Sequence, residues 1–370
     1  MIALLAALAA AHPPDAAAQA ALTEAGCVLC HTVPGTEAAK RQDSCSGCHL
    51  WITDVSADPA KRERAMAYFP LWERYEKTVA SYMAVPSIEA GRARLEPDWV
   101  IGWLADPHDI RPDMPEGMPR FRLSAEQEEA LRGWLSSGQH TPPTTPAPDL
   151  SRVEAGAALY QSRGCPACHS FGAQTASAPN PSAPDLAHTR DRMSADMIAA
   201  WIADPSTVSS AATMPSFGLT AEESLAVRDY LLLSEPGGAL PNAVLMPDAL
   251  TRPVRWAEVE ERVFGRICVH CHMDPAQNQG RAGPGNAGGF GWEATGIELQ
   301  TRAGVMAVAD RIPAALERRL HEAQRDTVSP GESPAVLERP DLPGMPLGLP
   351  PLPSEDIALV LAWIEQGMPE

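Results

Sequence analysis

The chain reads Cys165-Pro166-Ala167-Cys168-His169 near its middle, and this spacing of two cysteines and a histidine occurs four times. The other copies are Cys27-Val28-Leu29-Cys30-His31, Cys45-Ser46-Gly47-Cys48-His49 and Cys268-Val269-His270-Cys271-His272. Together they use all 8 cysteines, so none remains for a disulfide or a nucleophile. Two thiols at this spacing can each form a thioether with one vinyl group of a haem, and the next histidine can ligate the iron. The pattern predicts four covalent c-type haems, with iron held by His31, His49, His169 and His272.

Zinc is the alternative for the first two motifs. Two Cys-x-x-Cys pairs roughly 15–20 residues apart also describe a zinc site, and Cys27/Cys30 with Cys45/Cys48 come close to that spacing. Neither Cys165 nor Cys268 has a second cysteine pair nearby. A redox dithiol would leave the adjoining histidines unexplained. Haem attachment accounts for all four copies, whereas zinc accounts for two.

Composition sets the next limits. A length of 370 residues allows two or three domains. Proline is frequent, at 37 residues, and aromatic residues make up only 5%, so small domains of this chain would lack core that haem can supply. The net charge of −18 disfavours nucleic acid and suggests a redox protein partner with a basic docking face. The alternative is that this charge only keeps the protein soluble.

The first residues are typical of a secretory signal. An apolar run precedes small residues and His12-Pro13-Pro14, so residues 1–19 are predicted to be a signal peptide, although no Lys or Arg comes before the run. A misplaced start or a frayed helix is the alternative. Because bacteria attach haem to this motif outside the cytoplasm, we expect a periplasmic location. No stretch is long and apolar enough for a transmembrane helix, so we expect at most peripheral association with a respiratory complex.

Three segments repeat one pattern of Met-Pro, loop, helix cap and amphipathic helix. Met118-Pro119 precedes Ser124, Met214-Pro215 precedes Thr220, and Met345-Pro346 precedes Ser354. Ser124 with Gln127 and Thr220 with Glu223 are predicted capping boxes, and acids after Ser354 suit a helix N-terminus. We expect helices at about 125–136, 221–233 and 355–366, with entry helices at 153–161 and 256–266 leading into two of the cysteine motifs.

The predicted fold class is all-α, with three small helical domains in tandem. The predicted boundaries are 20–140 for a dihaem domain, 141–150 for a Pro-rich linker, 151–235 for a monohaem domain, 236–253 for a second linker and 254–370 for a last monohaem domain. The Pro/Thr-rich linker should be extended and semi-rigid. The Gly-rich segment 279–291 is predicted to be a loop over the haem. A phosphate-binding loop is the alternative, but no Lys-Ser/Thr follows.

Each unit resembles the class I cytochrome c family, in which the motif follows an N-terminal helix, a Met precedes Pro in a loop, and a C-terminal helix carries an aromatic residue. In that family the motif histidine and the loop methionine bind opposite faces of the iron. The resemblance implies that His169 pairs with Met214 and His272 with Met345. Gly26-Cys27 aligns with Gly164-Cys165, which suggests that His31 pairs with Met118, 87 residues further on. Methionine as a core filler is the alternative.

The haem at Cys45/Cys48 has no obvious distal ligand. His108 is the predicted one, although the family pattern does not require a histidine there and a surface histidine is the alternative. Met83, Met66 and Met114 are further candidates, and Met114 also competes with Met118. This haem would otherwise be five-coordinate.

Electron transfer is the leading functional hypothesis, because Met/His ligation closes both axial positions of an iron. The second hypothesis is a redox enzyme, peroxidase-like or acting on a small inorganic substrate, with an open site at the Cys45/Cys48 haem. A haem-bearing sensor or assembly module is the third.

Overall fold

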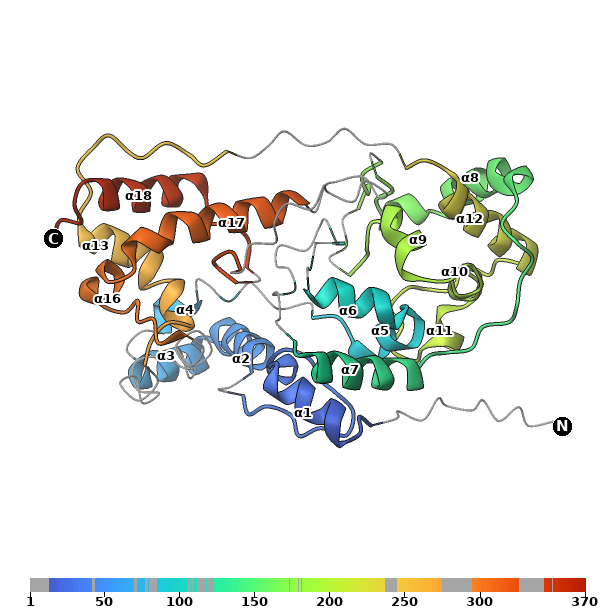
Figure 1. Cartoon of the computed structure of the whole chain (residues 1–370), viewed down its shortest axis with the longest axis horizontal. Coiled ribbons are helices and arrows are strands. Elements are labelled where there is room, and N and C mark those ends of the chain that lie inside the picture. The colour runs from blue at the N-terminus through green and yellow to red at the C-terminus, as the bar shows by residue number, and fades with distance from the viewer. Residues whose placement is uncertain are drawn as a thin grey trace. The chain divides into compact units, whose positions relative to one another are not determined.

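The computed structural model describes residues 13–41, 44–69, 72–76, 79, 85–105, 107, 110–111, 118, 123–172, 174–178, 180, 182–236, 245–274, 295–325, 343–347 and 349–370. Over these residues the regular structure is helical, and the β-type pairing is limited to an isolated bridge between Phe171 and Gln174 (Figure 1). The all-α class predicted from the sequence is confirmed.

The chain forms two compact units that are discontinuous in sequence. One contains the described residues of 1–38 and 84–241, and the other contains those of 39–83, 242–325 and 338–370. The motifs at Cys27 and Cys165 therefore share the first unit, while those at Cys45 and Cys268 share the second. The three tandem domains expected from the sequence remain a prediction.

The first unit begins with two helices that pack against each other. α1 (Ala16–Glu24) places small residues, Ala18 and Ala21, against Leu131 and Trp134 of α7 (Ala125–Ser137). α6 (Pro97–Ala105) packs beside α7. Arg92 of α5 (Ile88–Arg94) is buried, donates from Nε to the Trp134 carbonyl at 2.8 Å and lies over the Trp134 ring.

A second pair of packed helices, comparable to α1 and α7, lies later in the first unit. α8 (Val153–Ser162) crosses α12 (Ala221–Leu233), and Gly156 sits at the closest approach. The rings of Tyr160, Phe171 and Tyr230 lie 5.3–6.2 Å apart beside this crossing. α10 (Ala195–Ala203) packs on α12, and the short α9 (Thr189–Arg192) and α11 (Pro205–Val208) flank it.

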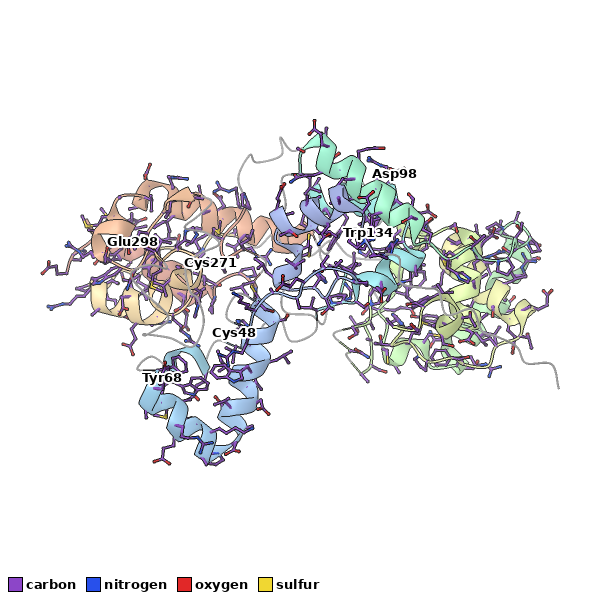
Figure 2. The ribbon with its side chains drawn as sticks, turned by 90° about the horizontal axis from the view of Figure 1, so that it is seen from below. Cys48, Tyr68, Asp98, Trp134, Cys271 and Glu298 are labelled. Carbon is purple, nitrogen blue, oxygen red and sulfur yellow. The ribbon has the colours of Figure 1, made fainter. Side chains whose placement is uncertain are left out.

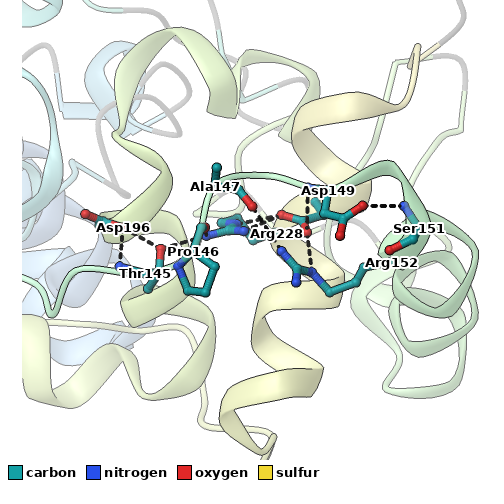
Figure 3. A network of polar contacts seen from close by, with 9 residues as sticks. Thr145, Pro146, Ala147, Asp149, Ser151, Arg152, Asp196 and Arg228 are labelled. Atoms are coloured by element: carbon teal, nitrogen blue, oxygen red, sulfur yellow. Dashed lines mark hydrogen bonds and ion pairs between the residues drawn. The ribbon is translucent and has the colours of Figure 1, made fainter.

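The Pro/Thr-rich segment before α8 has no helix, as its composition predicts, but it is held tightly to α12. Arg228 on α12 is fully buried and donates to the Thr145 hydroxyl at 2.7 Å and to the Pro146 carbonyl at 2.9 Å. Thr145 in turn donates to Asp196 of α10 (Figure 3). The side chain of Asp229, also fully buried, accepts from Arg228 at 2.7 Å. The Pro/Thr-rich segment is therefore packed onto α12 as part of the first unit.

The C-terminal part of the second unit has its own apolar core. α13 (Trp256–Val259) continues into a π-helical turn, η5 (Glu260–Phe264), which packs against α18 (Ser354–Glu365). Trp363 is fully buried between Trp256 and Phe264, with ring centroids 5.3 and 6.3 Å away. α16 (Arg302–Met306), η7 (Ala309–Arg311) and α17 (Ile312–Arg325) complete this part.

Three further helices of the second unit follow the Cys45 motif: α2 (Cys45–Ala57), α3 (Pro59–Tyr68) and α4 (Trp72–Glu76). Ile52, Val55 and Trp72 form their buried cluster. Glu76 accepts hydrogen bonds from Arg62 Nε, Trp72 Nε1 at 3.0 Å and Ser56 Oγ at 3.0 Å. One carboxylate thus joins all three helices.

The predicted helix starts are mostly confirmed. Both capping boxes are present, Ser124 with Gln127 and Thr220 with Glu223. Ser354 is the first helical residue and not the cap, because Pro353 occupies the cap position. The Gly-rich segment 279–291 lies outside the described residues. No helix in the described part of the chain has the length and apolar character needed to cross a bilayer.

Candidate functional site

Three of the four cysteine motifs form the same tight turn. η1 (Cys27–Leu29), η3 (Cys165–Ala167) and η6 (Cys268–His270) are single 3₁₀ turns that directly follow an entry helix. In each, the amide of the motif histidine donates to the carbonyl of the first cysteine, at 2.9–3.0 Å. The backbone therefore folds back so that both cysteines and the histidine project from one short loop.

A left-handed residue makes the turn possible in two of these motifs. Gly26 has φ 74° and Gly164 has φ 78°, a conformation that costs residues with a Cβ about 1–2 kcal/mol. Ile267 takes this place before Cys268 with φ −120°. The π-helical turn just before it gives the third motif a different entry.

The Cys45 motif has another local structure. Cys45 is the first residue of α2, and the Ser44 hydroxyl caps this helix by accepting from the Gly47 amide at 3.0 Å. Cys48 thus lies on the first turn of an α-helix (Figure 2), and His49 follows it in the same helix. All eight cysteines lie in the described part of the chain, and none forms a disulfide.

Each histidine of the three turn motifs is anchored through the same ring atom. Nδ1 lies within hydrogen-bond distance of a backbone carbonyl oxygen: 3.0 Å to Pro86 for His31, 2.8 Å to Pro184 for His169 and 3.2 Å to Ile297 for His272. A carbonyl can only accept, so Nδ1 must carry the proton. Nε2 is then left with its lone pair, which is the state that a metal requires.

The surroundings favour the neutral form of these rings. Burial lowers the pKa of His31, His169 and His272 from the usual value, and it outweighs the carbonyl bonds, which act in the opposite direction. Burial also raises the pKa of the Cys27 and Cys48 thiols to about 11 and that of Cys268 to about 12. Among the described residues, no three acidic, cysteine or histidine side chains gather as a metal site.

The two motifs of the second unit are electrostatic neighbours. The Cys271 side chain is exposed at the surface. Desolvation by the surrounding protein nevertheless raises the pKa of its thiol to about 12, and the charge interaction with Cys45 acts in the same direction. Figure 2 labels Cys48 and Cys271 of these motifs.

The candidate distal ligands are only partly described. Met214 and Met345 are half-buried in irregular loops, and the Met345 amide donates to the Ala315 carbonyl of α17 at 2.9 Å. Gly344 allows this loop to contact α17, because a Cβ at position 344 would lie 2.3 Å from the backbone nitrogen of Arg319. Met118 is half-buried as well. His108, Met83 and Met114 lie outside the described residues.

Met66 has a different environment from the other methionines. It lies on α3 and packs against the cluster of Ile52, Val55 and Trp72. This contact fits a core side chain.

A covalent haem fits the donor set of the three turn motifs. Each offers two thiols on one short loop and a neutral imidazole whose Nδ1 is anchored, which are the groups needed for two thioethers and one iron ligand.

Sequence reasoning did not find the three carbonyls that anchor the histidines. A signal was present for two of them, because Pro86 and Pro184 each immediately precede a helix-capping side chain. Ser87 caps α5, Asp185 caps η4 (Leu186–His188), and Glu298 accepts from two amides of the next turn. The cap fixes the direction of the preceding carbonyl.

Residues 153–234 match the family model described as cytochrome c. The match runs from α8 to α12 and includes Cys165, Cys168, His169 and Met214. It supports a c-type cytochrome with covalently bound haem and iron, and it suggests haem-based electron transfer with redox protein partners. No curated protein and no solved structure matches the chain.

Proposed function

We propose that this protein is a tetrahaem c-type cytochrome that transfers electrons between redox partners. The observation that carries the proposal is the anchored histidine turn. It occurs inside the cytochrome c match, at His169, and again outside it, at His31 and His272. The fourth motif, at Cys45, Cys48 and His49, has the same sequence pattern on a helix.

The residues of the chain have two tasks in this function. The cysteines fix the cofactor covalently, and the anchored imidazoles present Nε2 to the iron. Bound haem supplies one-electron cycling of its iron between ferrous and ferric states. The short turns would keep each donor in place before and after electron transfer.

The distal positions belong to the same proposal. Met214 would hold the iron together with His169, Met345 together with His272, and Met118 together with His31. The backbone bond from Met345 to α17 supports this assignment by fixing its loop. His108 is the proposed distal ligand of the Cys45/Cys48 haem.

The proposed site of action is outside the bacterial cytoplasm, reached through a signal at residues 1–19. The partner would present a basic face to a chain with a net charge of −18. Peripheral docking on a respiratory complex fits the same charge.

Haem counting by motif tests the proposal. The full chain would be produced in a host that matures c-type cytochromes, and haem per chain would be measured by pyridine haemochrome absorbance and intact mass. We expect four haems, and three in each variant in which one cysteine pair is changed, for example Cys165→Ala/Cys168→Ala. Colourless protein, or zinc in place of iron, would refute the proposal.

A redox enzyme is the second candidate, because the Cys45 motif begins an α-helix whereas the others form 3₁₀ turns. This difference singles out one haem for an open axial position. Carbon monoxide and cyanide binding separates the candidates. A carrier should show only low-spin, six-coordinate haem that binds neither. Binding that disappears in Cys45→Ala/Cys48→Ala would favour the enzyme.

A further inference from the structure

Helix α5 begins directly after the carbonyl that anchors His31. His31 Nδ1 lies 3.0 Å from the Pro86 carbonyl oxygen, and the next residue, Ser87, caps α5 by accepting from the Ala90 amide at 3.3 Å. The direction of the Pro86 carbonyl therefore depends on where α5 lies. A helix of 7 residues is only about two turns long and is not stable alone in water, so its packing partners must fix its position.

The first set of partners comes from the N-terminal part of the first unit, which precedes the cytochrome c match. Arg92 is buried and donates from Nε to the Trp134 carbonyl at 2.8 Å and from a terminal nitrogen to the Ser137 hydroxyl at 2.9 Å. The His140 amide donates to the Ala93 carbonyl at 2.9 Å. These contacts tie α5 to the C-terminal end of α7 and to the chain just after it.

The second set of partners comes from the cytochrome c match itself. The Arg94 guanidinium lies over the ring of Trp201 on α10, with its Cζ 4.4 Å from the ring centroid. A guanidinium over an indole face is an attractive contact that gains strength with burial. Ala93 packs in the core that α8, α10 and α12 share, and the Glu96 amide donates to the Arg192 carbonyl at 3.0 Å. Helix α5 thus lies beside both α7 and α11 (Figure 1).

The anchor of His169 is held in a comparable way. His169 Nδ1 lies 2.8 Å from the Pro184 carbonyl oxygen, and the next residue, Asp185, donates its amide to the Ile110 carbonyl at 2.8 Å. Ile110 is buried and belongs to the N-terminal part of the first unit. The segment that anchors each of the two histidines is therefore bonded to the part of the unit that carries the other histidine.

We propose that the contact of α5 with the cytochrome c match positions His31, so that Trp201 is a positioning residue for the histidine of a different haem motif. This inference rests on the proposed haem attachment at Cys27 and Cys30. A metal-binding imidazole is oriented by the partner of its second ring nitrogen, and that partner is in turn held by the packing around it. The two motifs of the first unit then form one module, in which a change beside one motif reaches the ligand of the other.

The proposal predicts a change at His31 that a purely local role of Trp201 would not cause. Removing the Trp201 ring loosens the C-terminal end of α5, so the Pro86 carbonyl leaves Nδ1 more often. The Nδ1 proton of His31 then reaches solvent more often, because hydrogen exchange reports local opening. The imidazole also becomes a weaker donor to iron, which disfavours the ferric state and raises one reduction potential.

The test is Trp201→Leu in the full, haem-loaded chain. After haem per chain has been checked, NMR of the ferrous protein with isotope-labelled histidine would measure exchange of the Nδ1 protons, and the His31 signal would be identified by its loss in Cys27→Ala/Cys30→Ala. We expect the His31 proton to exchange about two- to tenfold faster than in wild type, the range that one hydrogen bond contributes. Trp256→Leu is the matched control, because Trp256 is also half-buried but belongs to the other compact unit, and it should leave this proton unchanged.

Three outcomes would overturn the inference. A loaded Trp201→Leu protein whose His31 proton exchanges as in wild type would show that α7 alone holds α5. An equal acceleration at His272 would indicate general destabilisation and not positioning. If Trp201→Leu does not accumulate with haem, Arg94→Gln takes its place, because it removes the cation from the Trp201 ring, and unchanged exchange at His31 in that variant is the third.

These outcomes differ from a failure of the tetrahaem proposal. A wild-type protein that lacks haem at Cys27 and Cys30 would contradict the count of four, and its mass would show this before any exchange is measured. The contacts of α5 belong to the polypeptide, so exchange of backbone amides would then decide the inference. Trp201→Leu should still speed exchange in α5 and in residues 27–31, whereas Trp256→Leu should not, and unchanged exchange in Trp201→Leu would overturn the inference here too.

Discussion

At Gly156 two helices of the cytochrome c match come so close that no larger residue fits. A Cβ added there would lie 1.9 Å from the Ala226 carbonyl oxygen and 2.8 Å from the Tyr230 Cβ. Gly133 in α7 is a helical glycine with nothing within 4 Å of its added Cβ. Substitutions at Gly156 and Gly133 therefore distinguish the effect of helix packing on stability from the effect of helix propensity.

We predict that Gly156→Ala destabilises the protein by about 3 kcal/mol, because the backbone of α12 must move away from α8. Gly133→Ala should instead leave stability unchanged or raise it by up to about 1 kcal/mol, since alanine is the better helix former. Denaturant unfolding followed by circular dichroism measures both. Equal effects of the two changes would show that the crossing is looser than described.

The residue scale is also where the sequence was most informative about the site. The eight cysteines and four histidines follow from the motif alone, because thioether chemistry requires that local spacing. The carbonyls of Pro86, Pro184 and Ile297 lie 15–55 residues away from the histidines that they anchor. Which carbonyl meets which histidine depends on tertiary packing, and the helix caps beside the carbonyls do not specify it.

At the scale of elements, the carboxylate of Glu76 joins α2, α3 and α4. Hydrogen bonding from Arg62 has the largest effect and lowers the pKa of Glu76, against the opposing effect of burial. A hydrogen bond from Ser56, the charge of Arg62 and a hydrogen bond from Trp72 lower this pKa further. A carboxyl group whose pKa is lower in the folded state stabilises the fold above its unfolded pKa of about 4.3, and this contribution is lost as the pH falls through the folded value.

We therefore predict that amides of α3 exchange hydrogen severalfold faster in Glu76→Gln at pH 7, and that this difference from wild type disappears in acid. Hydrogen exchange with mass spectrometry measures both at the level of peptides. Glu73→Gln is the control, because Glu73 meets Arg62 at 3.4 Å and is 62% exposed. A Glu73 effect as large as that of Glu76 would contradict the assignment.

The segment before α8 shows how an element can differ from its composition. Its prolines correctly indicate an extended chain, but Arg228 fixes Thr145 and Pro146 onto α12 (Figure 3). The available sequence signal was Arg228 within the apolar run 225–233, since a charged residue in such a run needs partners from another segment.

We predict that Thr145→Val costs about 1–3 kcal/mol, because the buried Arg228 loses an acceptor while the side-chain volume is kept. Thr144→Val, at an exposed neighbouring position, should change stability by less than about 0.5 kcal/mol. Thermal unfolding of the two haem-loaded variants gives the comparison. A Thr145→Val protein as stable as wild type would mean that the contact between Arg228 and the Thr145 hydroxyl does not hold the segment on α12.

At the scale of the whole molecule, the elements follow from local signals, whereas their grouping into domains depends on tertiary contacts. The helices at 125–137, 221–233 and 354–365 follow from caps and apolar spacing, which are local. The assignment of residues 39–83 to the same compact unit as the C-terminal segments depends on contacts between distant parts of the chain. A prediction made along the sequence places residues 39–83 in the same domain as their neighbours in the sequence.

The helices are short, and we expect the proposed haems to contribute to the stability of the whole fold. The longest described helix, α17, has 14 residues, while α13 has 4 and α16 has 5. Isolated helices shorter than about 12–15 residues are marginal in water, so these elements depend on tertiary packing. With aromatic residues at 5% of the chain, we expect bound haem to supply part of the apolar surface needed for that packing.

We predict that the chain produced without residues 1–19 in a bacterial cytoplasm, where the motifs receive no haem, retains less than half of the far-ultraviolet helix signal of the loaded protein.

Changing one cysteine pair alone, as Cys268→Ala/Cys271→Ala in a haem-loading host, should remove protection from hydrogen exchange in α13 and α18. The helices α8 and α12 should keep their protection, because they belong to the other compact unit. A colourless chain that unfolds cooperatively from full helical content would show that protein side chains alone fill these cores.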